Sequence, residues 1–238
     1  MIDKVNINNL EINCYTSVDD ASNYIIENNL DDANIAIAIN PEKILSSLEN
    51  KAILSTLEAA DIRYLDGIGT VKVAEKRIGK KLSRIPGCEL WESLMSKAGK
   101  SNIPVYILGA NKTVVSKTVT KLKNDYSVNI VGYHDGFFEN DDDLIKSILS
   151  TKPRILTVAL GSPRQEIFMK RCKELGADFF MMGVGGTYNV YTGEVKRAPR
   201  IWCNLNLEWL YRLLNEPSRI KRQIKLLNFI KLYFLNRI

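Results

Sequence analysis

The chain has 238 residues, 45% of them hydrophobic, which is enough for one sizeable core or for a core with a small appendage. It carries 33 lysines and arginines against 27 acidic residues, a net charge of +6. The four cysteines lie far apart without C-x-x-C spacing, and His134 is the only histidine, which argues against a disulfide framework or a Cys/His zinc site. No basic stretch followed by an apolar one opens the sequence, so we expect a cytoplasmic protein without a secretory signal.

The positive charge is concentrated at the C-terminal end of the sequence. From Arg212 to Ile238 there are seven basic residues and one acidic residue, Glu216, so this segment accounts for the whole net charge. A segment of this kind is expected to face an anionic partner, which could be nucleic acid, a phosphate ligand or an anionic lipid surface.

Strand-length apolar runs alternate with helical patterns along most of the chain. A hairpin is expected around Val5 to Tyr15. Nearly continuous hydrophobicity is typical of strands buried on both faces, with the intervening helices as two covering layers. We therefore predict an α/β fold: a Rossmann-like, doubly wound, mostly parallel sheet of about six strands. The runs are residues 33–40, 62–66, 104–109, 128–133, 154–161 and 178–186.

Two helix starts are expected from capping signals. Asn40 precedes Pro41 as an N-cap before a first-turn proline, and Ser162 with Gln165 three residues later forms a capping-box pattern.

The pattern changes after Arg200 to helices rich in Trp, Leu and Tyr and then in basic residues. We predict a catalytic domain over residues 1–198 and a small basic helical appendage over 199–238. Its apolar stretch from Leu226 to Leu235 is too short to cross a bilayer and contains Lys231, so it is expected to lie on a membrane.

Asp66 ends the second predicted strand and is followed by Gly67, Ile68 and Gly69. Ligands bind at the carboxyl ends of strands in open α/β sheets, so a carboxylate at this position could take a proton from an attacking hydroxyl. The spacing alone also fits an aspartate that caps the next helix or lies in the turn before it, and it favours that simpler interpretation.

Other strand ends carry small residues. The turn after the last run contains Gly185, Gly186 and Thr187, and its consecutive amides could bind an anion, although a simple tight turn fits equally well. We expect Gly109, Gly161 and the pair Asp135 and Gly136 to line the same rim.

Asp141, Asp142 and Asp143 form a D-x-D string, which in some enzymes holds a divalent metal. Here the string begins a predicted helix, where acidic residues are favoured by the helix dipole. We therefore predict a helix start, no metal site and no cofactor.

Arg212, Arg219 and Arg222 are spaced so that they share roughly one helical face, and three guanidinium groups could neutralise a diphosphate without a metal. A solvated basic face is the simpler alternative for a helix of this composition.

Seven blocks in order, spread over nearly the whole chain, resemble the WecG/TagA/CpsF family, and within it the branch that transfers N-acetyl-D-mannosaminuronic acid in the synthesis of enterobacterial common antigen. The blocks are INPEK (39–43), YLDGIG (64–69), PGCELWESLM (86–95), VNIVGYHDGFF (128–138), TVALGSPRQEIFM (157–169), MGVGGTYNVYTGEVKRAP (182–199) and LEWLYRLLNEPSRIKRQ (207–223).

The resemblance implies a metal-independent, inverting transfer of an N-acetylmannosamine-type sugar from a UDP donor to undecaprenyl-diphosphate-linked GlcNAc, giving a β1,4 linkage. It places the catalytic base on Asp66 and a conserved glutamine on Gln165. The family's appendage arginines fall on Arg212, Arg219 and Arg222. Teichoic-acid members carry a threonine at about Ala38, and its loss here argues for a different sugar.

We accordingly expect UDP-sugar and polyprenyl-diphosphate substrates, a peripheral position on the inner face of the plasma membrane and no nucleic-acid partner, with a homo-oligomer left open. Within this reading the alternative donor is UDP-N-acetylmannosamine. A Rossmann-type oxidoreductase is disfavoured, since INPEK contains no glycine of a dinucleotide fingerprint. A non-catalytic nucleic-acid-binding module would use the basic segment but leaves the glycine-rich strand ends unexplained.

Overall fold

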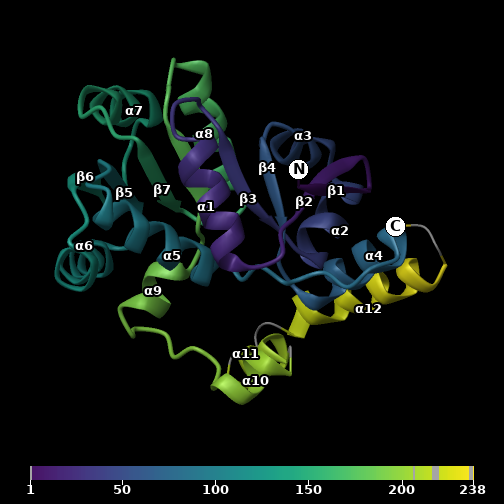
Figure 1. Cartoon of the computed structure of the whole chain (residues 1–238). Coiled ribbons are helices and arrows are strands. Elements are labelled where there is room, and N and C mark those ends of the chain that lie inside the picture. Colours follow the sequence, from purple (N-terminus) through teal and green to yellow (C-terminus); the bar gives the residue numbers. More distant parts are fainter. Residues whose placement is uncertain (1, 206, 216–219, 236–237) are drawn as a thin grey trace.

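A computed structural model describes residues 2–205, 207–215, 220–235 and 238, without the side chains of residues 200, 204, 212, 215 and 220–225. One eight-stranded sheet with helices on both faces forms the body of the protein (Figure 1). The predicted α/β class is confirmed, and each of the six apolar runs contains a strand. The strands are β1 Asp3–Ile7, β2 Leu10–Cys14, β3 Ile35–Ile39, β4 Ile62–Leu65, β5 Val105–Gly109, β6 Ile130–His134, β7 Ile155–Ala159 and β8 Phe180–Gly183.

The strand order is β1-β2-β4-β3-β8-β7-β5-β6, and every neighbouring pair is parallel except β1 and β2. The expected N-terminal hairpin is therefore present. It also extends the sheet, because β2 pairs with β4 through Asn13 and Tyr64. The parallel strands are buried by two helical layers, which explains their continuous hydrophobicity.

Each face of the sheet has its own core. Helices α2, α3, α4, α7, α8 and α12 cover one face, and α1, α5, α6 and α9 cover the other. The helices are α1 Val18–Asn28, α2 Pro41–Glu49, α3 Lys51–Glu58, α4 Ile68–Ile78, α5 Gly87–Lys100, α6 Lys112–Tyr126, α7 Asp141–Ser150, α8 Arg164–Glu174, α9 Thr187–Tyr191, α10 Arg200–Asn204, α11 Glu208–Asn215 and α12 Ile220–Phe234.

Of the two capping predictions, one is confirmed and the other is wrong. Asn40 caps α2 as expected, since its side chain accepts a hydrogen bond from the Lys43 amide at 2.9 Å. The capping box at Ser162 is wrong, because α8 begins after Pro163 without a side-chain cap and Gln165 bonds elsewhere. Asp141 to Asp143 lie in the first turn of α7, as predicted.

The connections after β3 and β8 leave the sheet on opposite faces, one to α2 and the other to α9. Those after β5 and β7 also diverge, to α6 and to α8. A crevice forms where neighbouring parallel strands send their connections to opposite faces. Crevices of this kind are therefore expected between β3 and β8 and between β5 and β7, and the connections after the neighbours β7 and β8 diverge as well.

The C-terminal helix α12 packs along α2 and α4 (Figure 1). Phe229 is buried in the core and lies over Gly69, where a Cβ atom would be 3.1 Å from the phenylalanine ring and 2.8 Å from Pro41. The opposite side of α12 exposes Leu227 and Phe234. The division at residue 198 stays a prediction, but this part of the proposed appendage is attached to the body by apolar contact.

We predict that Phe229→Ala lowers the free energy of unfolding by about 3 kcal/mol, because it leaves a cavity between α12 and the first turns of α2 and α4. Phe234→Ala on the same helix is the matched control. Its side chain is exposed, so its effect should stay within about 0.5 kcal/mol. Urea denaturation of the three proteins measures this, and equal midpoints for the two variants would contradict the docking of α12.

Candidate active site

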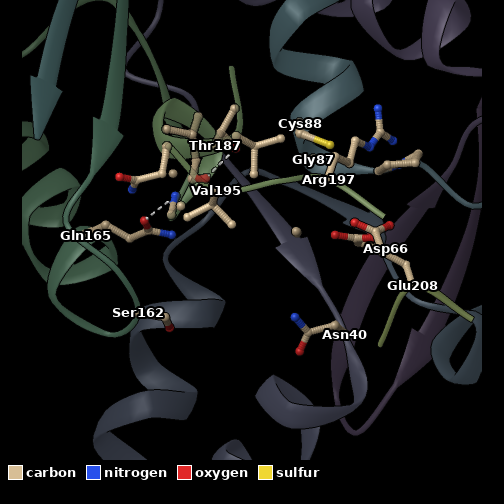
Figure 2. A pocket seen from close by; sticks show the side chains of 18 of the residues that line it. Asn40, Asp66, Gly87, Cys88, Ser162, Gln165, Thr187, Val195, Arg197 and Glu208 are labelled. Carbon is tan, nitrogen blue, oxygen red and sulfur yellow. Dashed lines mark hydrogen bonds between the residues drawn. The ribbon is translucent and has the colours of Figure 1, made fainter. Parts of the chain in front are cut away.

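A cavity of about 640 Å³ opens at the carboxyl edge of the sheet, where β3 and β8 diverge. Asn40 follows β3 and Asp66 follows β4, while Gly185, Gly186 and Thr187 follow β8, and all five line it. Gln165 from the first turn of α8 completes the predicted residues that the structure brings together here. Figure 2 shows Gln165 and Asp66 on opposite sides of the cavity.

Asp66 is held by backbone hydrogen bonds and is not the N-cap residue of the following helix. Its N–H donates to the Ile39 carbonyl at 2.9 Å, and its own carbonyl accepts from the Thr70 hydroxyl at 3.1 Å. The residue before α4 is Gly67, whose φ of 93° is the left-handed conformation that glycine adopts without strain. Gly67 therefore takes the N-cap position, while Asp66 lies in the turn between β4 and α4 with its carboxylate lining the cavity.

Gln165 fixes the glycine-rich turn after β8. Its Oε1 accepts a hydrogen bond from the Gly185 amide at 2.9 Å, and its Nε2 donates to Glu166 Oε1 at 3.0 Å. A Cβ atom on Gly183 would lie 2.7 Å from that Nε2, so the glutamine needs a glycine there. The Thr187 amide also bonds internally, to the Val184 carbonyl. Two amides of the expected anion-binding turn are thus already occupied.

Behind Gln165 lies a buried ion pair. Lys43 Nζ, from the first turn of α2, donates to Glu166 Oε1 at 2.7 Å, and the two side chains are 11% and 1% exposed. A carboxylate this deep is stabilised only while its partner remains. The pair joins α2 to α8 at the wall of the cavity, which Lys43 lines. No local pattern signals this contact, because 123 residues separate its members.

The chain segment after α9 and the start of α11 form the remaining wall. Val195, Lys196 and Arg197 line the cavity together with Glu208 and Tyr211. Arg197 is paired with Glu89 at the start of α5.

Glu208 is buried at the beginning of α11, and its Oε2 lies 3.3 Å from Arg84 Nη1. Residues on both sides of the predicted boundary therefore form one cavity. Sequence reasoning missed Glu208, although it belongs to the LEWLYR block.

Burial changes the pKa values of Cys88, in the first turn of α5, and of Tyr64, in β4. It raises the pKa of the Cys88 thiol to about 11, so the thiol remains protonated at neutral pH. Burial, with Asp66 nearby, also raises the pKa of the Tyr64 hydroxyl well above its ordinary value. Neither group was a predicted site residue.

The other predicted ligand-binding residues lie at the second crevice, between β5 and β7, and are absent from the described lining of the cavity. Gly109 has φ of 115°, and a Cβ on it would be 2.5 Å from the Ala159 carbonyl oxygen. Gly136 donates to the Ala110 carbonyl at 2.7 Å, and Asp135 accepts from the Phe137 amide. Gly161 also adopts a left-handed conformation. These conformations and contacts place the residues in tight turns, and their part in ligand binding stays a prediction.

The three predicted arginines cannot be placed. Arg219 lies outside the described residues, and so do the side chains of Arg212 and Arg222. Among the described residues, no three His, Cys, Asp or Glu side chains are arranged to hold a metal ion. Asp142 of the D-x-D string is engaged by Arg171 through two hydrogen bonds, at 2.8 and 2.6 Å.

Comparison with protein families gives one match that covers almost the whole chain. Residues 5–238 match the model of the glycosyl transferase WecG/TagA/CpsF family. The chain belongs to this family. It is therefore a glycosyltransferase, of a family that acts in the synthesis of bacterial cell-surface polysaccharides.

In the part of the chain that is described, no helix combines the length and the hydrophobicity needed to cross a bilayer.

We predict that Lys43→Met lowers the free energy of unfolding by about 3 kcal/mol, because it leaves the Glu166 carboxylate buried without its cation. The double variant Lys43→Met/Glu166→Gln should recover most of that loss, since no unpaired charge remains. Thermal and urea unfolding of the single and double variants test this. Additive losses would show that the two side chains act independently.

Proposed function

We propose that the protein transfers N-acetyl-D-mannosaminuronic acid from its UDP donor to undecaprenyl-diphosphate-linked GlcNAc, with inversion, without a metal and with a β1,4 linkage. The observation that carries the proposal is the position of Asp66. Its carboxylate lines a cavity at the carboxyl edge of a parallel sheet, opposite Gln165 and the turn after β8. Family membership supplies the class of reaction.

In this mechanism the 4-hydroxyl of the acceptor GlcNAc attacks the anomeric carbon of the donor. The new bond joins that carbon to the acceptor oxygen, the bond to the diphosphate oxygen breaks, and Asp66 takes the hydroxyl proton. The departing UDP carries additional negative charge, which fixed donors and cations must stabilise. We assign that role to Arg212, Arg219, Arg222 and the Gly185–Gly186 turn, in which the Gly186 amide is not one of the two amides already bonded within the protein.

The choice of donor sugar rests on Ala38. It lines the cavity, so the hydroxyl that teichoic-acid members would carry at this position is missing from the surface that faces the ligand. A uronic acid donor would bring a carboxylate, and Lys196 on the exposed rim offers it a cation.

UDP-N-acetylmannosamine is the second candidate donor. It is favoured by the fact that Lys43 and Arg197, two cations of the lining, are already paired with Glu166 and Glu89. A neutral sugar would not disturb either pair.

We further propose that α12 holds the protein on the inner face of the plasma membrane, where the lipid-linked acceptor would be found. The helix exposes Leu227, Ile230 and Phe234 while its other side is docked on the body, and Lys231 follows in its last turn. An apolar strip flanked by basic residues can enter the headgroup region of an anionic bilayer.

We predict that Asp66→Asn lowers turnover by a factor on the order of 10² to 10⁴ while leaving UDP affinity unchanged, because only proton acceptance is lost. The control is Asp143→Asn, an equally conservative change in the first turn of α7. It should retain wild-type turnover, which also tests the D-x-D string. Steady-state kinetics with a polyprenyl-diphosphate-GlcNAc acceptor give both values, and normal turnover of Asp66→Asn would remove this residue from the mechanism.

The whole proposal is tested by supplying the same acceptor with UDP-N-acetyl-D-mannosaminuronic acid or UDP-N-acetylmannosamine, with and without EDTA. We expect the disaccharide-lipid with the uronic acid donor, formed at the same rate in EDTA. Product with the neutral donor alone would establish the second candidate, and loss of product in EDTA would contradict metal independence.

A further inference from the structure

The Tyr64 hydroxyl is a buried polar group without a hydrogen-bond partner. Tyr64 is the third residue of β4, its side chain is fully buried, and its hydroxyl oxygen makes no hydrogen bond within the described structure. The residue nevertheless lines the cavity. Leaving a buried hydroxyl unpaired is costly, so such groups in native proteins call for an explanation.

The position of Tyr64 follows from the strand. Side chains two residues apart point to the same side of a strand, so Tyr64 and Asp66 project in one direction from the end of β4. An atom placed as Cβ on Gly87 would be 3.1 Å from the Tyr64 hydroxyl oxygen and 3.9 Å from Asp66 Oδ2. Both groups therefore lie next to the same point at the start of α5, where the glycine leaves room.

The chemistry of this pair is complementary. Burial, the neighbouring Asp66 carboxylate and more distant acids all favour the neutral phenol, so at neutral pH Tyr64 carries its proton. A phenol of this kind is a hydrogen-bond donor, whereas the adjacent carboxylate is an acceptor. A ligand that satisfies both presents an oxygen and a hydroxyl close together, as sugars do.

We infer that the Tyr64 hydroxyl binds substrate directly, donating a hydrogen bond to an oxygen of the sugar carried by the UDP donor. This rests on the proposed function, because it takes the cavity to be a nucleotide-sugar site. Tyr64 touches the sugar and not the nucleotide, since its hydroxyl lies beside Asp66, where the proposed transfer occurs. It therefore contributes to the choice of sugar.

The test compares Tyr64→Phe with Tyr15→Phe. Tyr15 is the matched control because it is also buried with an unpartnered hydroxyl, but it packs against Tyr24 and is not part of the described lining. Each change removes the oxygen atom of one buried, unpartnered hydroxyl. If the hydroxyls had only a structural role, both variants would behave alike.

Titration calorimetry with UDP and with UDP-N-acetyl-D-mannosaminuronic acid measures the effect without requiring turnover. We expect Tyr64→Phe to bind the UDP-sugar about tenfold more weakly and UDP unchanged, the loss of one hydrogen bond. Tyr15→Phe should bind both as the wild type does. The melting temperature of neither variant should fall, since each loses an unpaired polar atom.

Three outcomes would overturn the inference: unchanged UDP-sugar affinity in Tyr64→Phe, an equal loss for UDP and the UDP-sugar, or the same loss in Tyr15→Phe. They are distinct from failure of the proposed function. If the wild-type protein did not bind UDP at all, the nucleotide-sugar site itself would be wrong and the role of Tyr64 with it.

Discussion

The candidate site depends on the buried contact between Lys43 and Glu166. The pair links α2, which follows β3, to α8, which follows β7, and Glu166 also accepts from Gln165. Gln165 in turn holds the Gly185 amide after β8. Three strand ends are thus connected by one continuous polar network. Removing a charge from its centre would leave the others without support, since buried polar networks are stable only when their members are satisfied.

Much of the fold could be predicted from hydrophobic patterning alone. The six apolar runs all contain strands because each is covered by helices on both faces, and Asn40 with Pro41 gives a local signal that the structure confirms. The failed capping box at Ser162 shows the limit of local reasoning. A glutamine three residues after a serine has two competing partners, and here the amide of Gly185, 20 residues away, prevails.

The composition of the site was harder to predict because it depends on pairings between distant segments. Glycines at strand ends look alike in the sequence, yet those after β8 reach the cavity and those after β5 and β7 lie at the neighbouring crevice. What separates them is the place of each strand in the sheet, where β8 is the direct neighbour of β3 and β7 and β5 lie farther along. Tyr64 and Glu208 lie in two of the family blocks, but no pattern in the sequence indicated that either belongs to the site. Their burial becomes apparent only in three dimensions.

The contact of Phe229 with Gly69 and Pro41 fixes the position of α12 relative to the cavity. Pro41 and Gly69 belong to the first turns of α2 and α4, which begin one and two residues after Asn40 and Asp66. The helix that exposes Leu227 and Phe234 is therefore braced against the same two turns that carry the cavity's polar groups. If α12 rested on a membrane, the bilayer surface would lie at a fixed distance and angle from Asp66. A lipid-borne acceptor would then have to bridge one constant distance, and the reach of its diphosphate-sugar head would select which substrates can react.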